Sequence, residues 1–219
     1  MGKPTPEPFK AIIVGAGITG LTLANIFKRI GIDFILLEAE HKIDRRVGFI
    51  YGCWPYAARI LDQIDCWNDL ELATDTLAEH EIRLDDGSAL ISNGGGIDPN
   101  MLVSPLLESE REATDMDLCL SRFGYDQRVT ERHILVRILL EKLGGDPRVI
   151  TGERVATILH HADGVQLLSQ TGHTYSGDIV VGCDGVHSVV RRLMWERADE
   201  VQPGLISTPD KQGDRAKTG

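Results

Sequence analysis

A glycine-rich hexapeptide near the amino terminus has the residue types and spacing to bind a phosphate-bearing ligand. Gly15, Gly17 and Gly20 stand in the pattern G-x-G-x-x-G, within the run Gly15-Ala16-Gly17-Ile18-Thr19-Gly20. In a dinucleotide-binding loop, the first glycine allows a tight turn and the second lets a pyrophosphate approach the backbone. The third lets a helix and a strand pack closely. The hexapeptide alone is equally compatible with a structural turn, so the flanking elements must decide.

The flanking residues predict a strand, a helix and a second strand. Residues 11–14 are a short, mostly β-branched run that is typical of a buried strand. Apolar residues recur at helical spacing from Ile18 to Ile30, and Gly31 is placed to end that helix. Residues 34–37 form a second apolar run, which a right-handed crossover would lay parallel to the first. The loop would then lie at a helix N-terminus, where backbone N–H groups and the helix dipole favour an anion.

Glu38 stands at the end of the second predicted strand, 23 positions after Gly15. A carboxylate there can accept hydrogen bonds from both ribose hydroxyls of an adenosine, and it would repel a 2′-phosphate. The glycine loop lies between a predicted strand and a predicted helix, and Glu38 stands at the expected distance along the chain. Together these features favour a dinucleotide site over a structural turn. The fingerprint does not distinguish NAD from FAD, so an NAD-dependent dehydrogenase stays open on these residues.

A second candidate lies at the end of another predicted buried strand, over residues 179–181. Asp184 and Gly185 follow that strand. This order would place a carboxylate at the carboxyl edge of a sheet, where ligands of α/β proteins bind. Taken alone, an Asp-Gly pair is more typical of a plain turn.

Two arginines, Arg132 and Arg191, are candidates for binding a phosphate or a substrate. Arg132 lies in a helix predicted over residues 131–143, and Arg191 and Arg192 lie in a basic helical segment predicted over 189–195. A guanidinium can hold a phosphate with its planar fork. From spacing alone, Arg132 is more typical of a solvated helix charge, and Arg191 and Arg192 are compatible with a solvated basic face, which an acidic protein uses for solubility.

The histidines and Ser188 form no recognisable metal or nucleophile motif. His160-His161, His173 and His187 lack the spacing of a metal cluster, so no metal site is predicted. Ser188 follows His187 directly, but adjacency in sequence sets no base-to-nucleophile geometry. Hydrolase activity is therefore not supported.

The composition excludes several other classes of protein. Acidic residues number 33 against 23 basic ones, for a net charge of -10, which disfavours nucleic-acid binding. No apolar run is long enough to span a membrane, and the start, MGKPTPEPFK, has no signal core. The four cysteines are far apart, which indicates free thiols in a reducing compartment. We expect a cytoplasmic protein or one peripheral to an intracellular membrane, with its oligomeric state open.

Three segments of the chain together resemble group A flavoprotein monooxygenases, in particular fungal FAD-dependent monooxygenases and epoxidases of meroterpenoid and indole-diterpene pathways. These segments are residues 15–38, 48–62 and 183–191. The resemblance implies an α/β, Rossmann-like FAD/NAD(P)-binding fold of the three-layer, glutathione-reductase-like kind, with an incomplete substrate-binding β-sheet portion. It also implies FAD and NADPH as cofactors, and hydroxylation or epoxidation of an apolar, meroterpenoid or terpenoid intermediate with O₂.

The resemblance assigns roles residue by residue. It implies a substrate or catalytic role for Arg191. The residues that it implies for cofactor binding are Gly15, Gly17, Gly20, Glu38, Gly52, Arg132, Asp184 and Gly185.

The predicted domain organisation is simple. We expect a flexible lead over residues 1–8, one FAD-binding domain over 9–212 and an unstructured tail over 213–219. An irregular insertion at about 94–120 has no counterpart in the family. Family members continue further, with a second flavin motif, so the chain is interpreted as truncated at its carboxyl end. A catalytically inactive flavin-binding fragment is therefore an alternative to an active monooxygenase.

Overall fold

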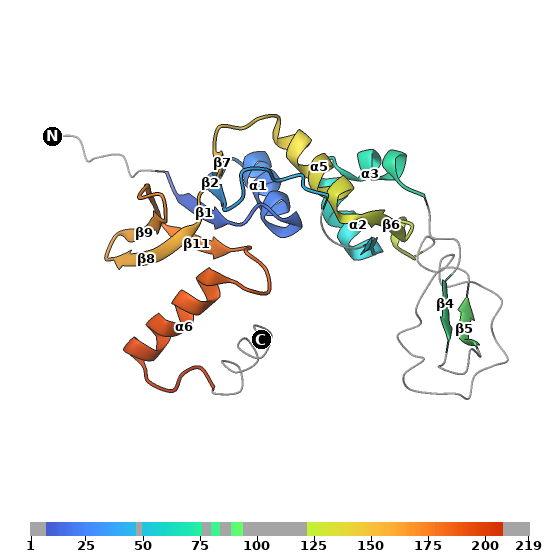
Figure 1. The fold of residues 1–219 in the computed structure, drawn as a ribbon. Helices are drawn as coiled ribbons and strands as arrows, with labels where there is room; N and C mark the ends of the chain where they lie inside the picture. The colour runs from blue at the N-terminus through green and yellow to red at the C-terminus, as the bar shows by residue number, and fades with distance from the viewer. Residues whose placement is uncertain (1–7, 47–49, 76–79, 84–88, 94–121, 208–219) are drawn as a thin grey trace. The chain divides into compact units, whose positions relative to one another are not determined.

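The computed structural model describes residues 8–46, 50–75, 80–83, 89–93 and 122–207. The chain divides into two compact units (Figure 1). The first consists of Met1–Arg45 and Leu139–Gly219, and the second of Arg46–Ile138. The predicted insertion at 94–120 and the tail at 213–219 lie outside the described residues, as does nearly all of the lead. The single domain over 9–212 stays a prediction.

A parallel four-stranded sheet is the centre of the first unit. Its strand order is β11-β1-β2-β7, and each neighbouring pair is parallel. The strands are β1 (Lys10–Val14), β2 (Asp33–Glu38), β7 (Val149–Thr151) and β11 (Ile179–Gly182). Ala11, Ile12 and Ile13 of β1 are completely buried, which confirms the buried strand predicted from that apolar run.

The two faces of this sheet are covered differently, which gives three layers. One face packs against a three-stranded antiparallel sheet through a core that includes Ile12, Leu37 and Leu167. That sheet comprises β8 (Val155–His161), β9 (Gly164–Ser169) and β10 (Thr174–Gly177). Side chains alternate along a strand, so Phe34 faces the other way and meets Phe27 of a helix, with ring centroids 6.4 Å apart. These layers confirm the predicted fold class.

Among the described residues, the helices that belong wholly or partly to the first unit are α1 (Ile18–Ile30), the end of α5 (Arg132–Leu143), and α6 (Val189–Val201). Helix α1 ends at Gly31, whose φ of 75° is left-handed and whose N–H donates to the Phe27 carbonyl, as predicted. Asn25 of α1 donates to the Leu139 carbonyl of α5 at 2.9 Å and so joins the two helices.

Helix α6 is longer than predicted. The sequence indicated a helix only over residues 189–195, whereas the structure continues it to Val201 through a mostly charged stretch. Within this extension, Arg197 pairs with Glu200 at 2.9 Å, and Arg192 reaches into it to pair with Glu196 at 2.8 Å. Such pairs support an exposed helix, although each is weak.

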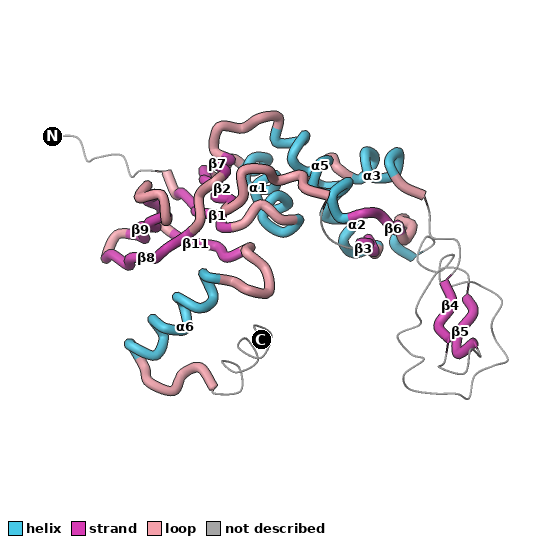
Figure 2. Tube along the Cα trace, in the orientation of Figure 1, coloured by secondary structure: helices cyan, strands magenta, loops and turns pink. Residues whose placement is uncertain are grey.

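The second unit combines short strands and helices (Figure 2). Its elements, besides the start of α5, are β3 (Ile50–Cys53), α2 (Pro55–Gln63), α3 (Trp67–Ala73), β4 (His80–Arg83), β5 (Ala89–Asn93) and β6 (Arg128–Glu131). The helical spacing of Ala57, Ile60 and Leu61 fits α2, and β4 pairs with β5 in antiparallel fashion. Helix α3 and the antiparallel pairing of β3 with β6 were not predicted. Among the described helices, none is long and apolar enough to cross a membrane.

Candidate functional site

The glycine loop joins β1 to α1 at the carboxyl end of the parallel sheet. Gly15 has a left-handed φ of 102°, and its N–H donates to the Leu37 carbonyl at 2.8 Å. A Cβ at Gly15 would lie 2.6 Å from the Cys183 carbonyl oxygen, and one at Gly20 would lie 1.9 Å from the Gly15 carbonyl oxygen. Glycine is therefore needed at both positions, for the close packing that the sequence pattern predicts.

The N-terminus of α1 leaves its first N–H groups without a partner from the helix. Gly17 precedes the helix with an extended backbone, and no side chain of the described residues caps this end. The first backbone bond of the helix runs from the Leu21 N–H to the Gly17 carbonyl at 3.0 Å. The first turn also contains no acidic residue. The N–H groups of residues 18–20 and the helix dipole thus present a positive end suited to an anion.

Glu38 ends β2 with its carboxylate against the glycine loop. One oxygen, Oε2, accepts the Ala16 N–H at 2.7 Å, and Oε1 accepts the Glu40 N–H at 2.9 Å. Each carboxylate oxygen can accept a further hydrogen bond, and the residue is only partly buried. The structure therefore brings together the glycine loop and Glu38, which lie far apart in the sequence, with lone pairs available for ligand hydroxyls.

The Asp-Gly pair follows β11 at the same edge of the sheet. Strand β11 lies beside β1, and the Cys183 N–H donates to the Val14 carbonyl at 2.7 Å. Gly185 has a φ of 80°, and a Cβ there would meet nothing within 4 Å. Glycine at 185 is thus favoured by the backbone conformation and not by lack of space.

The carboxylate of Asp184 caps helix α6. Its Oδ2 accepts the N–H groups of Val189 and Val190 at 2.6 and 3.2 Å. Its Oδ1 accepts the Ser188 hydroxyl at 2.5 Å, and the Ser188 hydroxyl oxygen in turn accepts the Arg191 N–H at 2.9 Å. The cap formed by Asp184 and Ser188 was not predicted from the sequence. Ser188, which directly precedes a predicted helix, is nevertheless a recognisable N-cap signal.

Arg191 makes its identified contacts within its own loop and helix. Its Nη2 donates to the Val186 carbonyl at 2.6 Å, and its guanidinium carbon lies 5.5 Å from the centre of the Trp195 ring. These contacts hold the loop before α6 in place. A substrate or catalytic role for Arg191 stays a prediction.

Gly52 and Arg132 belong to the second unit. Gly52 lies in β3 opposite Val129 of β6, and a Cβ there would meet only Trp54 Nε1, at 3.8 Å. Arg132 is the first residue of α5, directly after β6, and is partly buried. Arg132 therefore follows the end of the pair at which Ile50 lies opposite Glu131, whereas Gly52 lies within the pair. Their roles in cofactor binding stay predictions.

The described cysteines are free, and two of them have raised pKa values. Burial raises the pKa of the Cys53 thiol to about 11. Burial, and then the nearby charge of Asp184, raise the pKa of Cys183. Both are therefore protonated thiols at neutral pH, and a thiol is a poor nucleophile. Within the described part of the chain, no group of three or more His, Cys, Asp or Glu residues gathers in a way that could hold a metal ion.

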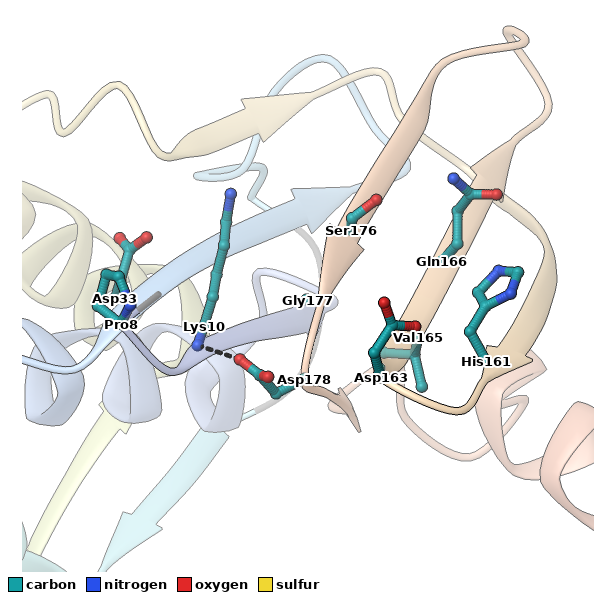
Figure 3. Close-up of a pocket in the computed structure, with 11 residues that line it drawn as sticks. Pro8, Lys10, Asp33, His161, Asp163, Val165, Gln166, Ser176, Gly177 and Asp178 are labelled. Carbon is teal, nitrogen blue, oxygen red and sulfur yellow. Dashed lines mark hydrogen bonds between the residues drawn. The ribbon is translucent and has the colours of Figure 1, made fainter. Parts of the chain in front are cut away.

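A hollow of about 690 Å³ lies at the opposite end of the sheet (Figure 3). Its lining includes Lys10 and Asp33, which begin β1 and β2, together with Asp163 and Asp178. The Lys10 N–H donates to the Asp178 carboxylate at 2.6 Å. Ligands of parallel α/β sheets bind at the carboxyl ends of the strands, whereas this hollow lies at the amino ends. It is therefore separate from the glycine loop and Glu38.

Comparisons with known proteins agree with this geometry. The family model described as "FAD binding domain" matches residues 9–201. The FAD-dependent monooxygenase ausM of Penicillium brasilianum is 34% identical over 203 residues, covering 93% of this chain and 38% of the relative. The FAD-dependent monooxygenase ctvC of Aspergillus terreus is 35% identical over 198 residues, which cover 90% of this chain and 37% of the relative.

A solved structure shows the same fold. Klebsiella pneumoniae HpxO, complexed with FAD and uric acid, superposes with a TM-score of 0.63 at 25% identity, covering 84% of this chain and 41% of that one. The chain thus spans about two fifths of the length of these relatives.

Proposed function

The chain belongs to the FAD-binding domain family, and from this premise we propose that its glycine loop and Glu38 hold the ADP half of FAD as part of a monooxygenase. The observation that carries the proposal is the position of Glu38, whose carboxylate lies 2.7 Å from the Ala16 amide nitrogen of the loop. A ribose acceptor and a phosphate-binding helix end are thus adjacent, as a dinucleotide requires.

The residues present fit the ADP half of the cofactor. The backbone at Gly15 and Gly20 packs too closely for any side chain, and the first N–H groups of α1 are uncapped among the described residues. These N–H groups would bind the pyrophosphate. Glu38 would accept the ribose hydroxyls, and because two backbone amides already orient its carboxylate, little ordering is needed on binding.

The remaining cofactor contacts are proposed from the family resemblance. Asp184 and Gly185 lie at the same edge of the sheet as the loop, where Asp184 could accept a ribityl hydroxyl in addition to capping α6. Gly52 would lie along the cofactor, and Arg132 would contact it with its guanidinium. Arg191 is proposed to face the substrate.

The proposed overall reaction consumes one substrate molecule, O₂, NADPH and a proton, and yields oxygenated substrate, NADP⁺ and water. Bound FAD would supply the transfer of electrons from NADPH to O₂, which protein side chains cannot perform. The proposed substrate is an apolar secondary-metabolite intermediate, of meroterpenoid or terpenoid type, that undergoes hydroxylation or epoxidation. This reaction is proposed for a protein of the relatives' full length, of which the chain spans about two fifths.

The test is cofactor binding by the purified chain of residues 1–219. We expect a protein-bound flavin band in the visible spectrum after FAD is added and excess is removed. Glu38→Arg is expected to abolish it, because the guanidinium cannot accept from ribose hydroxyls. Asp163→Arg is the matched control: it makes the same change of charge at an exposed residue of the β8–β9 turn and should leave the band unchanged.

Either of two results would contradict the proposal. A folded chain that binds no flavin but binds NAD would favour the dehydrogenase alternative. Equal flavin binding by Glu38→Arg and the wild type would show that Glu38 does not hold the ribose.

A further inference from the structure

A buried carboxylate, Glu153, lies between β7 and β8. Its side chain is only 7% exposed. The Thr171 hydroxyl donates to Oε2 at 2.8 Å, and His173 Nδ1 lies 2.7 Å from Oε1. The Ser169 hydroxyl is 2.6 Å from that of Thr171. These three partners come from the end of β9 and the turn that leads to β10, so Glu153 is bound to this turn by its side chain.

The environment of Glu153 keeps its carboxylate ionised. Burial alone would raise the pKa, but hydrogen bonds from Ser169, His173 and Thr171, with the nearby charge of His173, lower it to about 2. Burial, and then the charge of Glu153 and a hydrogen bond to it, raise the pKa of the nearby Tyr175 phenol. A buried, ionised carboxylate with several donors holds its position strongly, because breaking those bonds leaves an unsatisfied charge.

The backbone of the same residue holds the end of β2. The Glu153 N–H donates to the Glu38 carbonyl at 2.8 Å, and the Gly152 N–H donates to the Glu40 carbonyl at 3.3 Å. On the other side, the Gln170 N–H donates to the Arg154 carbonyl at 2.8 Å. Residues 152–154 therefore connect the β9–β10 turn to Glu38 and to Glu40, whose N–H orients the Glu38 carboxylate.

We propose that Glu153 is a positioning residue for the ribose site: its buried carboxylate anchors the backbone that holds Glu38 against the glycine loop. The role rests on the proposed function of Glu38 as the ribose acceptor. Loss of the anchor frees residues 152–154, and the Glu38 carbonyl and the Glu40 amide lose a fixed partner. The ribose hydroxyls then meet a carboxylate that is less well placed.

The test compares binding of ADP and 2′-deoxy-ADP, measured by calorimetry on the full chain. A hydrogen bond from a hydroxyl to a carboxylate makes the wild type favour ADP by about tenfold or more. In Glu153→Gln we expect the preference for ADP to fall to about threefold or less. A less well placed Glu38 carboxylate forms a weaker hydrogen bond with the ribose hydroxyl, so most of the discrimination between the two nucleotides is lost. Glu38→Ala removes the acceptor and should lose the preference, and Glu38→Ala/Glu153→Gln should lose no more than Glu38→Ala alone.

Two further variants keep the result interpretable. Thr171→Val removes one donor to the carboxylate while residue 153 stays glutamate, so a partial loss of preference is expected even if Glu153→Gln does not fold. Asp163→Asn removes a carboxylate from the exposed β8–β9 turn of the same small sheet and should keep the full preference.

The outcomes separate this role from the proposed function. Full preference for ADP in folded Glu153→Gln or Thr171→Val overturns the positioning role alone, and so does an equal loss of affinity for both nucleotides, which would indicate general structural damage. A wild-type chain that binds neither nucleotide overturns the proposed function, and the positioning role falls with it.

Discussion

Gly20 is the residue at which the glycine loop leaves least room for a side chain. A Cβ there would lie 1.9 Å from the Gly15 carbonyl oxygen, so Gly20→Ala must displace backbone of the loop or of α1. We expect the free energy of unfolding to fall by about 3 kcal/mol or more, measured by denaturant titration without cofactor. Gly31→Ala is the comparison, because its φ of 75° is left-handed but its surroundings are open, which costs about 1 kcal/mol. Equal losses of unfolding free energy in the two variants would show that the loop backbone shifts to accommodate a methyl group at position 20.

The ionisation of Glu153 should make stability depend on pH in acid. Its pKa is about 2 in the folded chain against an ordinary value of 4.5, so the unfolded chain binds the proton more readily. Its contribution to stability is complete above about pH 4.5 and is lost as the pH falls towards 2. Glu153→Gln is expected to flatten the fall in unfolding free energy across this window. Asp146 also has a pKa lowered to about 2, by its hydrogen bond from Arg148. It contributes a similar loss of unfolding free energy in acid, which Glu153→Gln does not remove.

A variant with the full wild-type pH dependence between 4.5 and 2 would contradict this assignment. The measurement is the unfolding midpoint in denaturant at several pH values. Asp146→Asn provides the matched control, since it removes the other lowered carboxyl and leaves Glu153 in place.

At the scale of elements, helix α6 depends on a carboxylate that lies outside it. Asp184 accepts two N–H groups of its first turn and the Ser188 hydroxyl. Asp184→Ala should therefore cost about 1–2 kcal/mol of unfolding free energy and speed hydrogen exchange of the Val189 and Val190 amides. Glu196→Ala removes only an exposed pair with Arg192 and should cost no more than about 0.5 kcal/mol.

Both α6 variants are to be measured without flavin, so that the proposed cofactor contact of Asp184 does not contribute. Unchanged exchange of the Val189 amide in Asp184→Ala would show that the carboxylate does not cap the helix.

At the scale of the whole molecule, cofactor contacts can be tested in each of the two units by itself. The glycine loop and Glu38 lie in the first, whereas Gly52 and Arg132 lie in the second. Saturating FAD is therefore expected to slow hydrogen exchange in residues 15–20 and also in 50–53. Its binding should raise the free energy of unfolding by about 2.7 kcal/mol at a hundred times its dissociation constant.

Protection confined to the first unit would remove Gly52 and Arg132 from the cofactor site while leaving the glycine loop and Glu38 in it. Glu38→Arg is the control. At the same FAD concentration it should show neither slower hydrogen exchange nor a higher free energy of unfolding.

The sequence alone determined the features that depend on neighbouring residues. The strand at residues 11–14, the loop glycines, the helix that ends at Gly31, and Glu38 after the second strand could all be predicted. A strand–helix–strand unit with a short loop allows essentially one arrangement, because the crossover is right-handed and the apolar runs must be buried. The family resemblance extended this to the three-layer fold, which the structure and the comparisons support.

The tertiary structure decided the contacts between segments that are far apart in the chain. The pairing of β3 with β6, the hydrogen bond from Glu153 to Glu38 and the cluster around the Glu153 carboxylate all join such segments. Neither propensity nor periodicity encodes these pairings, because a strand's partner and a carboxylate's donors depend on how the rest of the chain packs. Asp184 shows the difference most clearly: its place after a strand and the helix at 189–195 were both visible in the sequence, but the hydrogen bonds by which its carboxylate caps that helix became evident only from the structure.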